Sequence, residues 1–151
     1  MLDRILLEAE RRMFLSDYQQ PYKSNDKNAV PDAICYAACG AADKIAAQAI
    51  IAGTQSGSTA RLLTKYRPKQ PLFAATSVKH VVPRMALFWG VEPFYIPLDS
   101  NSTDDEINQA LHALRDEYGL KPGSRVVVTA GRTAKQSGAT SIMEVREIPR
   151  S

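Results

Sequence analysis

The chain has 151 residues, of which 44% are hydrophobic and 23% are charged, and its formal net charge is +3. These values are typical of one water-soluble globular domain with its own core. So small a positive charge, without a basic stripe, argues against nucleic-acid binding, and no apolar stretch approaches the ~20 residues that span a membrane.

The sequence divides into three segments, which we predict to be a helix at residues 1–18, a polar linker at 19–30 and an α/β domain at 31–151. In the first helix, Leu2 and Ile5 belong to an apolar stripe with helical spacing, while charged side chains fill the other face. Because this charged helix starts directly after Met1, we expect no signal peptide. The polar residues of the linker, with Pro21 among them, indicate no regular structure.

The α/β domain is predicted to begin with a helix from residue 31 to about residue 48. Pro31 suits a first helical turn, and Asp32 suits a cap or the positive end of the helix. The many alanines of this segment allow close packing.

The two cysteines, Cys35 and Cys39, lie four residues apart and therefore share one face of this helix. A metal site would need further ligands, and the only histidines, His80 and His112, are far away in sequence. We expect two small buried thiols in a reducing cytoplasm.

Apolar runs alternate with helical patterns over the rest of the chain. The strand predictions are 49–53, 72–77, 91–98, 125–130 and 142–148, and the helix predictions are one ending near 67, one at 79–89 and one from a capping box at 103–106 to Gly119. The last connection is too short for a crossover helix, so the final strand should be antiparallel. We therefore predict an α/β fold, a three-layer α/β/α sandwich around a five-stranded, mostly parallel sheet whose last strand is antiparallel.

The loop after the first strand is the candidate binding site. The first N–H groups of a helix lack intrahelical partners and lie at the positive end of the helix dipole. A glycine allows close backbone approach, and hydroxyls add hydrogen-bond donors, so the loop has the features of a phosphate cradle. The alternative is that Ser and Thr only cap the helix. The residues concerned are Thr54, Gln55, Ser56, Gly57, Ser58 and Thr59.

A second loop is predicted to meet the first. If the strand order is third, second, first, fourth, fifth, the loops after the first and fourth strands meet where ligands bind in such sheets. The second loop brings Arg132 and Lys135, followed by Gly138 and Thr140. Two cations beside a phosphate cradle fit a phosphorylated small molecule, although solvated loop charge is the alternative.

Several segments resemble a known family. Residues 54–61 resemble the Thr-x-Ser-Gly-x-Ser/Thr-Ala-Arg segment in the C-terminal domain of pyruvate kinase. The likeness continues through residues 65–68, 71–76, 84–93 and 123–131, in the order and spacing of the family. The ordered set covers almost the whole chain.

This resemblance implies a function beyond the chain itself. Pyruvate kinases transfer a phosphoryl group from phosphoenolpyruvate to ADP on a catalytic barrel, with Mg²⁺ and K⁺, and their C-terminal domain often holds an allosteric effector. The resemblance thus implies a phosphorylated effector bound by residues 54–59 and 132–140, and a homo-oligomer formed through the C-terminal domain. Ser58 stands where many relatives carry Arg, and residues 138–141 depart from a Gly-Thr-Thr-Asn pattern, so the identity of the effector is open.

The helix at residues 1–18 resembles the last helix of the catalytic barrel, which makes the barrel of a parent enzyme an expected partner. Because the chain holds no barrel and no magnesium-binding motif, we expect it to be inactive alone and to carry no cofactor. Two alternatives are a stand-alone module that binds phosphosugars or nucleotides, and a domain that serves only subunit assembly.

Overall fold

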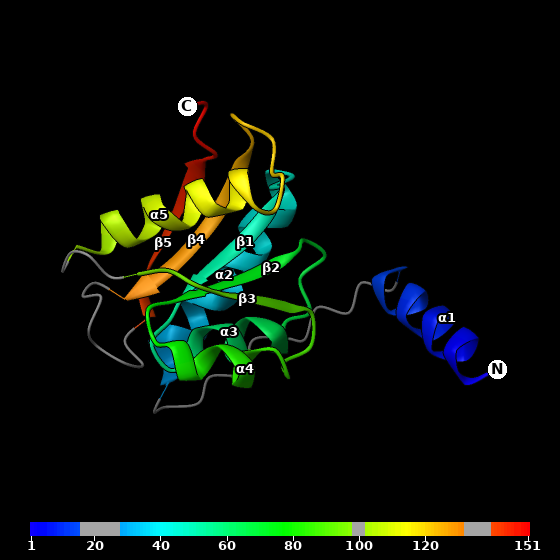
Figure 1. Cartoon of the computed structure of the whole chain (residues 1–151). Helices are drawn as coiled ribbons and strands as arrows, with labels where there is room; N and C mark the ends of the chain where they lie inside the picture. Colours follow the sequence, from blue (N-terminus) through cyan, green and yellow to red (C-terminus); the bar gives the residue numbers. More distant parts are fainter. Residues whose placement is uncertain (16–27, 98–101, 132–139) are drawn as a thin grey trace.

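A five-stranded sheet, with the strand order β3-β2-β1-β4-β5, forms the centre of the domain (Figure 1). The computed structural model describes residues 1–15, 28–97, 102–131 and 140–151. Both the predicted order and the antiparallel last strand are confirmed, since β5 pairs antiparallel with β4 and the other pairs are parallel. The strands are β1 (Ala49–Gly53), β2 (Leu72–Thr76), β3 (Val91–Tyr95), β4 (Arg125–Gly131) and β5 (Thr140–Glu147).

Side chains that alternate along the strands enter two separate cores, one on each face of the sheet. Ile50 and Ala52 of β1 pack in one core with residues of α2 (Ala29–Lys44), α3 (Ser58–Lys65) and α4 (Val82–Met85). Ala49 and Ile51 pack in the other core with α5 (Thr103–Asp116). The predicted three-layer α/β/α sandwich is therefore confirmed.

Helix α2 begins two residues before the predicted Pro31 and ends at Lys44, short of the predicted residue 48. Pro31 still lies in the first turn, where its missing N–H costs no intrahelical bond. The helix ends early because Ala46 adopts a positive φ of 50°, and Ala47 N–H turns back to the Ala42 carbonyl at 2.9 Å. This is the hydrogen-bonding pattern of a helix C-terminus in which one residue is left-handed.

The predicted helix at 79–89 is wrong. The structure has a 3₁₀ helix, η2 (Lys79–Val81), followed by the single turn of α4. Pro83 lies in the first turn of α4, where it offers no N–H to the turn before it, so a continuous helix through both elements is interrupted. The chain then turns through Gly90, with φ of 67°, into β3.

Helix α5 starts as predicted, but the predicted capping box is wrong. Its N-cap is Ser102, and no side chain in the described part of the chain caps the helix. Thr103 Oγ1 donates instead to the Gly131 carbonyl at 3.3 Å, which attaches the start of α5 to the end of β4. Glu106, the expected second member of the box, is buried, and within the ranges that the structure describes its Oε1 has no hydrogen-bond partner.

Other element boundaries differ from the predictions by a few residues. Strand β3 ends at Tyr95, before Ile96 and Pro97, and β5 begins at Thr140, two residues before the predicted start. Residues 98–101 and 132–139 lie outside the described residues.

Helix α1 (Leu2–Leu15) lies apart from the three layers (Figure 1). Its Leu2, Ile5 and Leu6 side chains are 73%, 57% and 55% exposed, so its apolar stripe is uncovered. Residues 16–18 of the predicted helix, and 19–27 of the predicted linker, lie outside the described residues. No helix in the described ranges combines the length and apolarity needed to cross a membrane.

Candidate functional site

The loop at residues 54–59 lies at the carboxyl end of β1, and α3 begins inside it at Ser58. Strand β1 pairs with β2 on one side and with β4 on the other, so the sheet order reverses between β1 and β4. In open α/β sheets this reversal is where ligands bind.

Gly57 sets the conformation of the loop. Its φ of 83° and ψ of 0° place it in the left-handed region, which disfavours a residue with a Cβ. A Cβ at this position would also lie 3.0 Å from Met85 Cγ and 3.4 Å from Phe88 Cε2. Two independent constraints therefore require glycine at this position. One is the backbone angle, and the other is the packing against the segment that follows β2.

The peptide group between Ser56 and Gly57 is held at both of its polar atoms. The Gly57 N–H donates to Thr54 Oγ1 at 2.9 Å. The Ser56 carbonyl accepts from Arg84 Nη2. No sequence pattern connected Arg84 with this loop, because Arg84 lies 28 residues further along the chain in α4.

The other polar side chains of the loop are paired locally. The Ser77 hydroxyl lies 3.0 Å from Gln55 Nε2 and 3.2 Å from Gln55 Oε1. Ser56 Oγ donates to Ser58 Oγ at 3.1 Å. The loop is thus joined to the end of β2 and is ordered by its own hydroxyls.

Thr59 and Thr140 are brought together from positions 81 residues apart. Their Oγ1 atoms lie 2.6 Å from each other, and both residues are buried. This contact joins the first turn of α3 to the start of β5. Of the predicted second loop, Thr140 lies in β5, while Arg132, Lys135 and Gly138 fall outside the described residues.

The first turn of α3 has free backbone donors. Helix α3 follows Gly57, and no described side chain caps it, which argues against the alternative that Ser and Thr of the loop only cap the helix. The first intrahelical bond runs from Arg61 N–H to the Gly57 carbonyl at 3.0 Å. In the described part of the chain, the N–H groups of Ser58, Thr59 and Ala60 meet no acceptor. These donors point along the positive end of the helix dipole, which favours an anion.

Cys35 lies beneath this turn, and neither of the two cysteines is a reactive thiol. Burial raises the pKa of the Cys35 thiol to about 12, with smaller contributions from Cys39 and Asp32, and burial raises the pKa of the Cys39 thiol to about 12 as well. Cys35 is buried as predicted and lies with its Sγ 3.9 Å from the Thr59 carbonyl, whereas Cys39 is only partly buried. Both groups stay protonated at neutral pH, and thiols in that state are poor nucleophiles and poor metal ligands.

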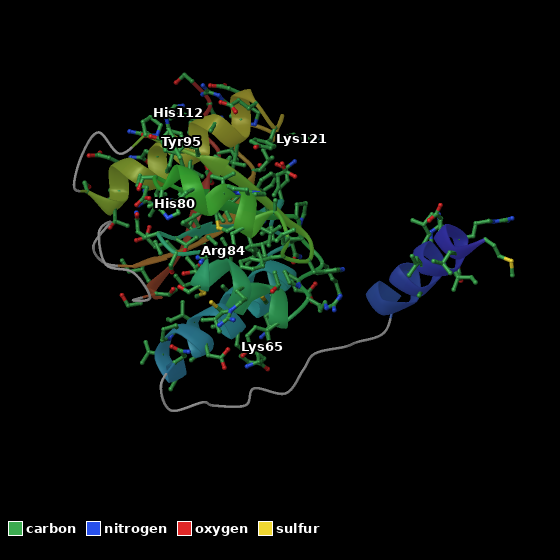
Figure 2. All side chains as sticks on the ribbon, turned by 60° about the horizontal axis from the view of Figure 1, so that its bottom comes forward. Lys65, His80, Arg84, Tyr95, His112 and Lys121 are labelled. Carbon is green, nitrogen blue, oxygen red and sulfur yellow. The ribbon has the colours of Figure 1, made fainter. Side chains whose placement is uncertain are left out.

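His80 and His112 lie on different elements, η2 and α5 (Figure 2). In the ranges that the structure describes, no three side chains of His, Cys, Asp or Glu gather as a metal site would require.

Asp32 has a structural role that its sequence position did not reveal. It is 2% exposed and lies between the start of α2 and the end of α3. Tyr66 Oη donates to Asp32 Oδ1 at 2.7 Å, and Lys65 Nζ lies 3.0 Å from Asp32 Oδ2, at the end of α3 marked by Lys65 in Figure 2. This cluster fixes α3, and hence the loop before it, against α2.

Comparison with known proteins agrees with this architecture. The family "Pyruvate kinase, alpha/beta domain" matches residues 32–146. The chain is 36% identical over 145 residues to a pyruvate kinase of Clostridium acetobutylicum, and 33% identical over 147 residues to one of Geobacillus stearothermophilus. These matches cover 96% and 97% of the chain, but only 30% and 25% of the relatives.

Solved structures give the same result. A crystal structure of Cryptosporidium parvum pyruvate kinase superposes with a TM-score of 0.67 at 27% identity, and a structure of that enzyme in complex with ADP superposes with a TM-score of 0.70 at 29% identity. They cover 85% and 86% of this chain, which spans 24% and 25% of theirs. The chain therefore belongs to the family of the pyruvate kinase alpha/beta domain, which is the C-terminal domain of that enzyme.

Proposed function

We propose that this domain regulates a pyruvate kinase by binding a phosphorylated small molecule at residues 54–59. The observation that carries the proposal is the uncapped first turn of α3 at the switch point of the sheet. There, the N–H groups of Ser58, Thr59 and Ala60 meet no acceptor among the described residues. Hydrogen bonds from such groups to an anion are charge-assisted and are stronger than neutral ones.

A phosphate group fits this turn better than a carboxylate does. It offers several strong acceptor oxygens to N–H groups that converge from successive residues. The hydroxyls of Ser56 and Ser58, already joined to each other, can orient toward a bound oxyanion. We assign Arg132 and Lys135, together with Gly138 and Thr140, to the side of the site that receives a second phosphate.

Calorimetry of the chain with inorganic phosphate, a sugar monophosphate and a sugar bisphosphate tests the proposal. With no arginine at position 58, a single phosphate should bind at about the millimolar level, which corresponds to about 4 kcal/mol. The bisphosphate should bind more tightly, and added salt should narrow the difference because exposed charges are screened.

Two variants distinguish the parts of the site. Ser56→Ala should weaken binding of all three ligands, whereas Arg132→Ala should weaken mainly the bisphosphate. Arg125→Ala is the matched control, because Arg125 is exposed at the start of β4, opposite the strand ends that carry the loop. Wild-type protein that shows no saturable binding would overturn the proposal.

We also propose that the domain assembles with a second copy and with the catalytic part of a parent enzyme. Strand β5 is an edge of the sheet, and exposed edges invite pairing with another chain. The uncovered apolar stripe of α1 is suited to contact the catalytic part. Phosphoryl transfer from phosphoenolpyruvate to ADP, with its Mg²⁺ and K⁺, belongs in this proposal to that catalytic part, in the cytoplasm.

A further inference from the structure

We infer that Arg84 is a positioning residue that holds the 54–59 loop in its anion-binding conformation, an inference that rests on the proposed function. Arg84 acts on the Ser56–Gly57 peptide group and not on the ligand. Its role is to keep the Ser56 carbonyl turned away from the first turn of α3.

The hydrogen bonds of the loop support this role. Arg84 Nη2 donates to the Ser56 carbonyl, and the Gly57 N–H of the same peptide group donates to Thr54 Oγ1 at 2.9 Å. The two bonds act on opposite ends of one planar unit, so together they fix its orientation. The Gly57 N–H is therefore not available to an anion, which leaves the three N–H groups that follow it.

Glycine makes this peptide group easy to turn over. The Gly57 angles, φ of 83° and ψ of 0°, are those of the third residue of a type II turn. Rotation of the preceding peptide group converts such a turn to type I, with φ of about −90° at the same residue, and glycine accepts both conformations. The rotated form would turn the Ser56 carbonyl oxygen, with its partial negative charge, in the opposite direction.

Arg84 is placed to select one of these two forms. The next residue, Met85, is fully buried and lies against Gly57, as does Phe88. The backbone that carries Arg84 is thus fixed by the same packing that requires glycine in the loop. The Arg84 side chain itself is exposed, and exposed contacts of this kind add little to stability. Its contribution is therefore the geometry of the loop, and substitution should leave the fold intact.

The experiment compares Arg84→Met, which removes the donor, with Arg84→Lys, which restores a charged donor, and Arg84→Gln, which offers an uncharged one. Arg125→Met is the control for loss of an exposed arginine at the other end of the sheet. Binding of inorganic phosphate to the whole chain is measured at low and high salt, and exchange of the Gly57 amide hydrogen is measured by NMR without ligand. Fluorescence of Trp89, the only tryptophan, confirms that each variant is folded.

We expect Arg84→Met to bind phosphate roughly tenfold more weakly, the effect of one hydrogen bond to a charged group. Its Gly57 amide should exchange faster than in wild type, and Arg84→Lys and Arg84→Gln should each recover part of both losses. Thr54→Val removes the other bond to the same peptide group, so combining it with Arg84→Met should cost less than the sum of the two changes.

The outcomes separate the two proposals. If wild type binds no phosphate, the proposed function fails and this inference fails with it. If wild type binds and Arg84→Met binds equally well, only the role of Arg84 is overturned. If Arg84→Met binds weakly only at low salt and leaves Gly57 exchange unchanged, Arg84 acts through its charge at a distance and the positioning role is wrong.

Discussion

Gly57 and Gly40 show how much the surroundings of one residue decide its substitution. Gly57 has a positive φ and its Cβ position is crowded by Met85, whereas Gly40 is helical and no atom of another described segment lies within 4 Å of its Cβ position. The same change to alanine should therefore have opposite effects at the two sites.

Gly57→Ala should lower the free energy of unfolding by at least about 1–2 kcal/mol, the cost of a left-handed conformation for a residue with a Cβ. Gly40→Ala should raise the free energy of unfolding by about 0.5–1 kcal/mol, because alanine loses less backbone entropy in a helix. Urea denaturation of both variants checks this. A neutral Gly57→Ala would mean that the loop does not hold glycine in this conformation.

A second prediction at this scale concerns Glu106. Burial raises the pKa of its carboxyl above the usual value, and its Oε1 has no hydrogen-bond partner among the described residues. A folded-state pKa above the unfolded one means that the fold favours the protonated form. The favourable contribution of this carboxyl to the stability of the fold is thus fully present below its pKa in the unfolded state. It is lost as the pH rises through its pKa in the folded state.

Glu106→Gln should remove this pH dependence, because glutamine does not titrate. At neutral pH the substitution should raise the free energy of unfolding by about 1 kcal/mol, reduced by the loss of the favourable interaction between a carboxylate and the helix N-terminus. The advantage should disappear in acid, below the usual pKa of a glutamate. Glu117→Gln, in the exposed turn just after α5, is the control. Thermal unfolding of the three proteins, from acid near the usual pKa of a glutamate to neutral pH, measures the effect. Parallel curves for wild type and Glu106→Gln would contradict it.

At the scale of elements, the cluster of Asp32, Lys65 and Tyr66 joins α2 to α3. Asp32→Asn keeps the shape of the side chain but removes its charge, and should cost about 1–3 kcal/mol because the hydrogen bonds become weaker or are lost. Tyr66→Phe should cost about 1 kcal/mol for one lost bond. The two losses should not add, since both act on Asp32. Chemical denaturation of the single and double variants gives the coupling, and full additivity would show that the cluster does not work as a unit.

Elements were predictable from the sequence where local signals and the fold agree. The buried strands are apolar runs bounded by turn residues, and the short connection before β5 required an antiparallel strand. The helix predicted at 79–89 failed because Pro83 interrupts an otherwise apolar helical pattern. The capping box failed because Ser102, and not Thr103, is the N-cap; Thr103 lies inside the first turn and donates to the Gly131 carbonyl, which only the folded chain brings near.

The residues of the candidate site were predictable where they lie together in sequence or where the strand order brings them near. Loop residues adjacent in sequence indicated a phosphate cradle, and the pattern of strands indicated that Thr140 would come near. Arg84 and Asp32 could not be assigned, because each acts on a partner 28 to 34 residues away.

At the scale of the whole molecule, β5 is the surface to test for assembly. Its Met143 and Val145 side chains are 36% and 49% exposed on an edge strand. If β5 pairs with a second copy, Val145→Lys should convert the dimer to a folded monomer. Glu92→Lys, exposed on the opposite edge strand β3, should leave the assembly unchanged. Light scattering across the micromolar range decides, and a wild type that is monomeric throughout would contradict the prediction.

Because β1 lies at the centre of the sheet, binding of a ligand to the loop at its end should change the stability of the whole domain. Strand β1 has a parallel partner on each side and contributes to both cores, so we expect its amide hydrogens to exchange through unfolding of the whole domain. An anion held at the end of this strand is released by that same event. Binding at 100 times the dissociation constant would therefore add about 2.7 kcal/mol to the stability of the whole domain. Binding of an anion to this small loop would therefore be measurable as a higher melting temperature of the domain and as slower hydrogen exchange in the middle of the sheet.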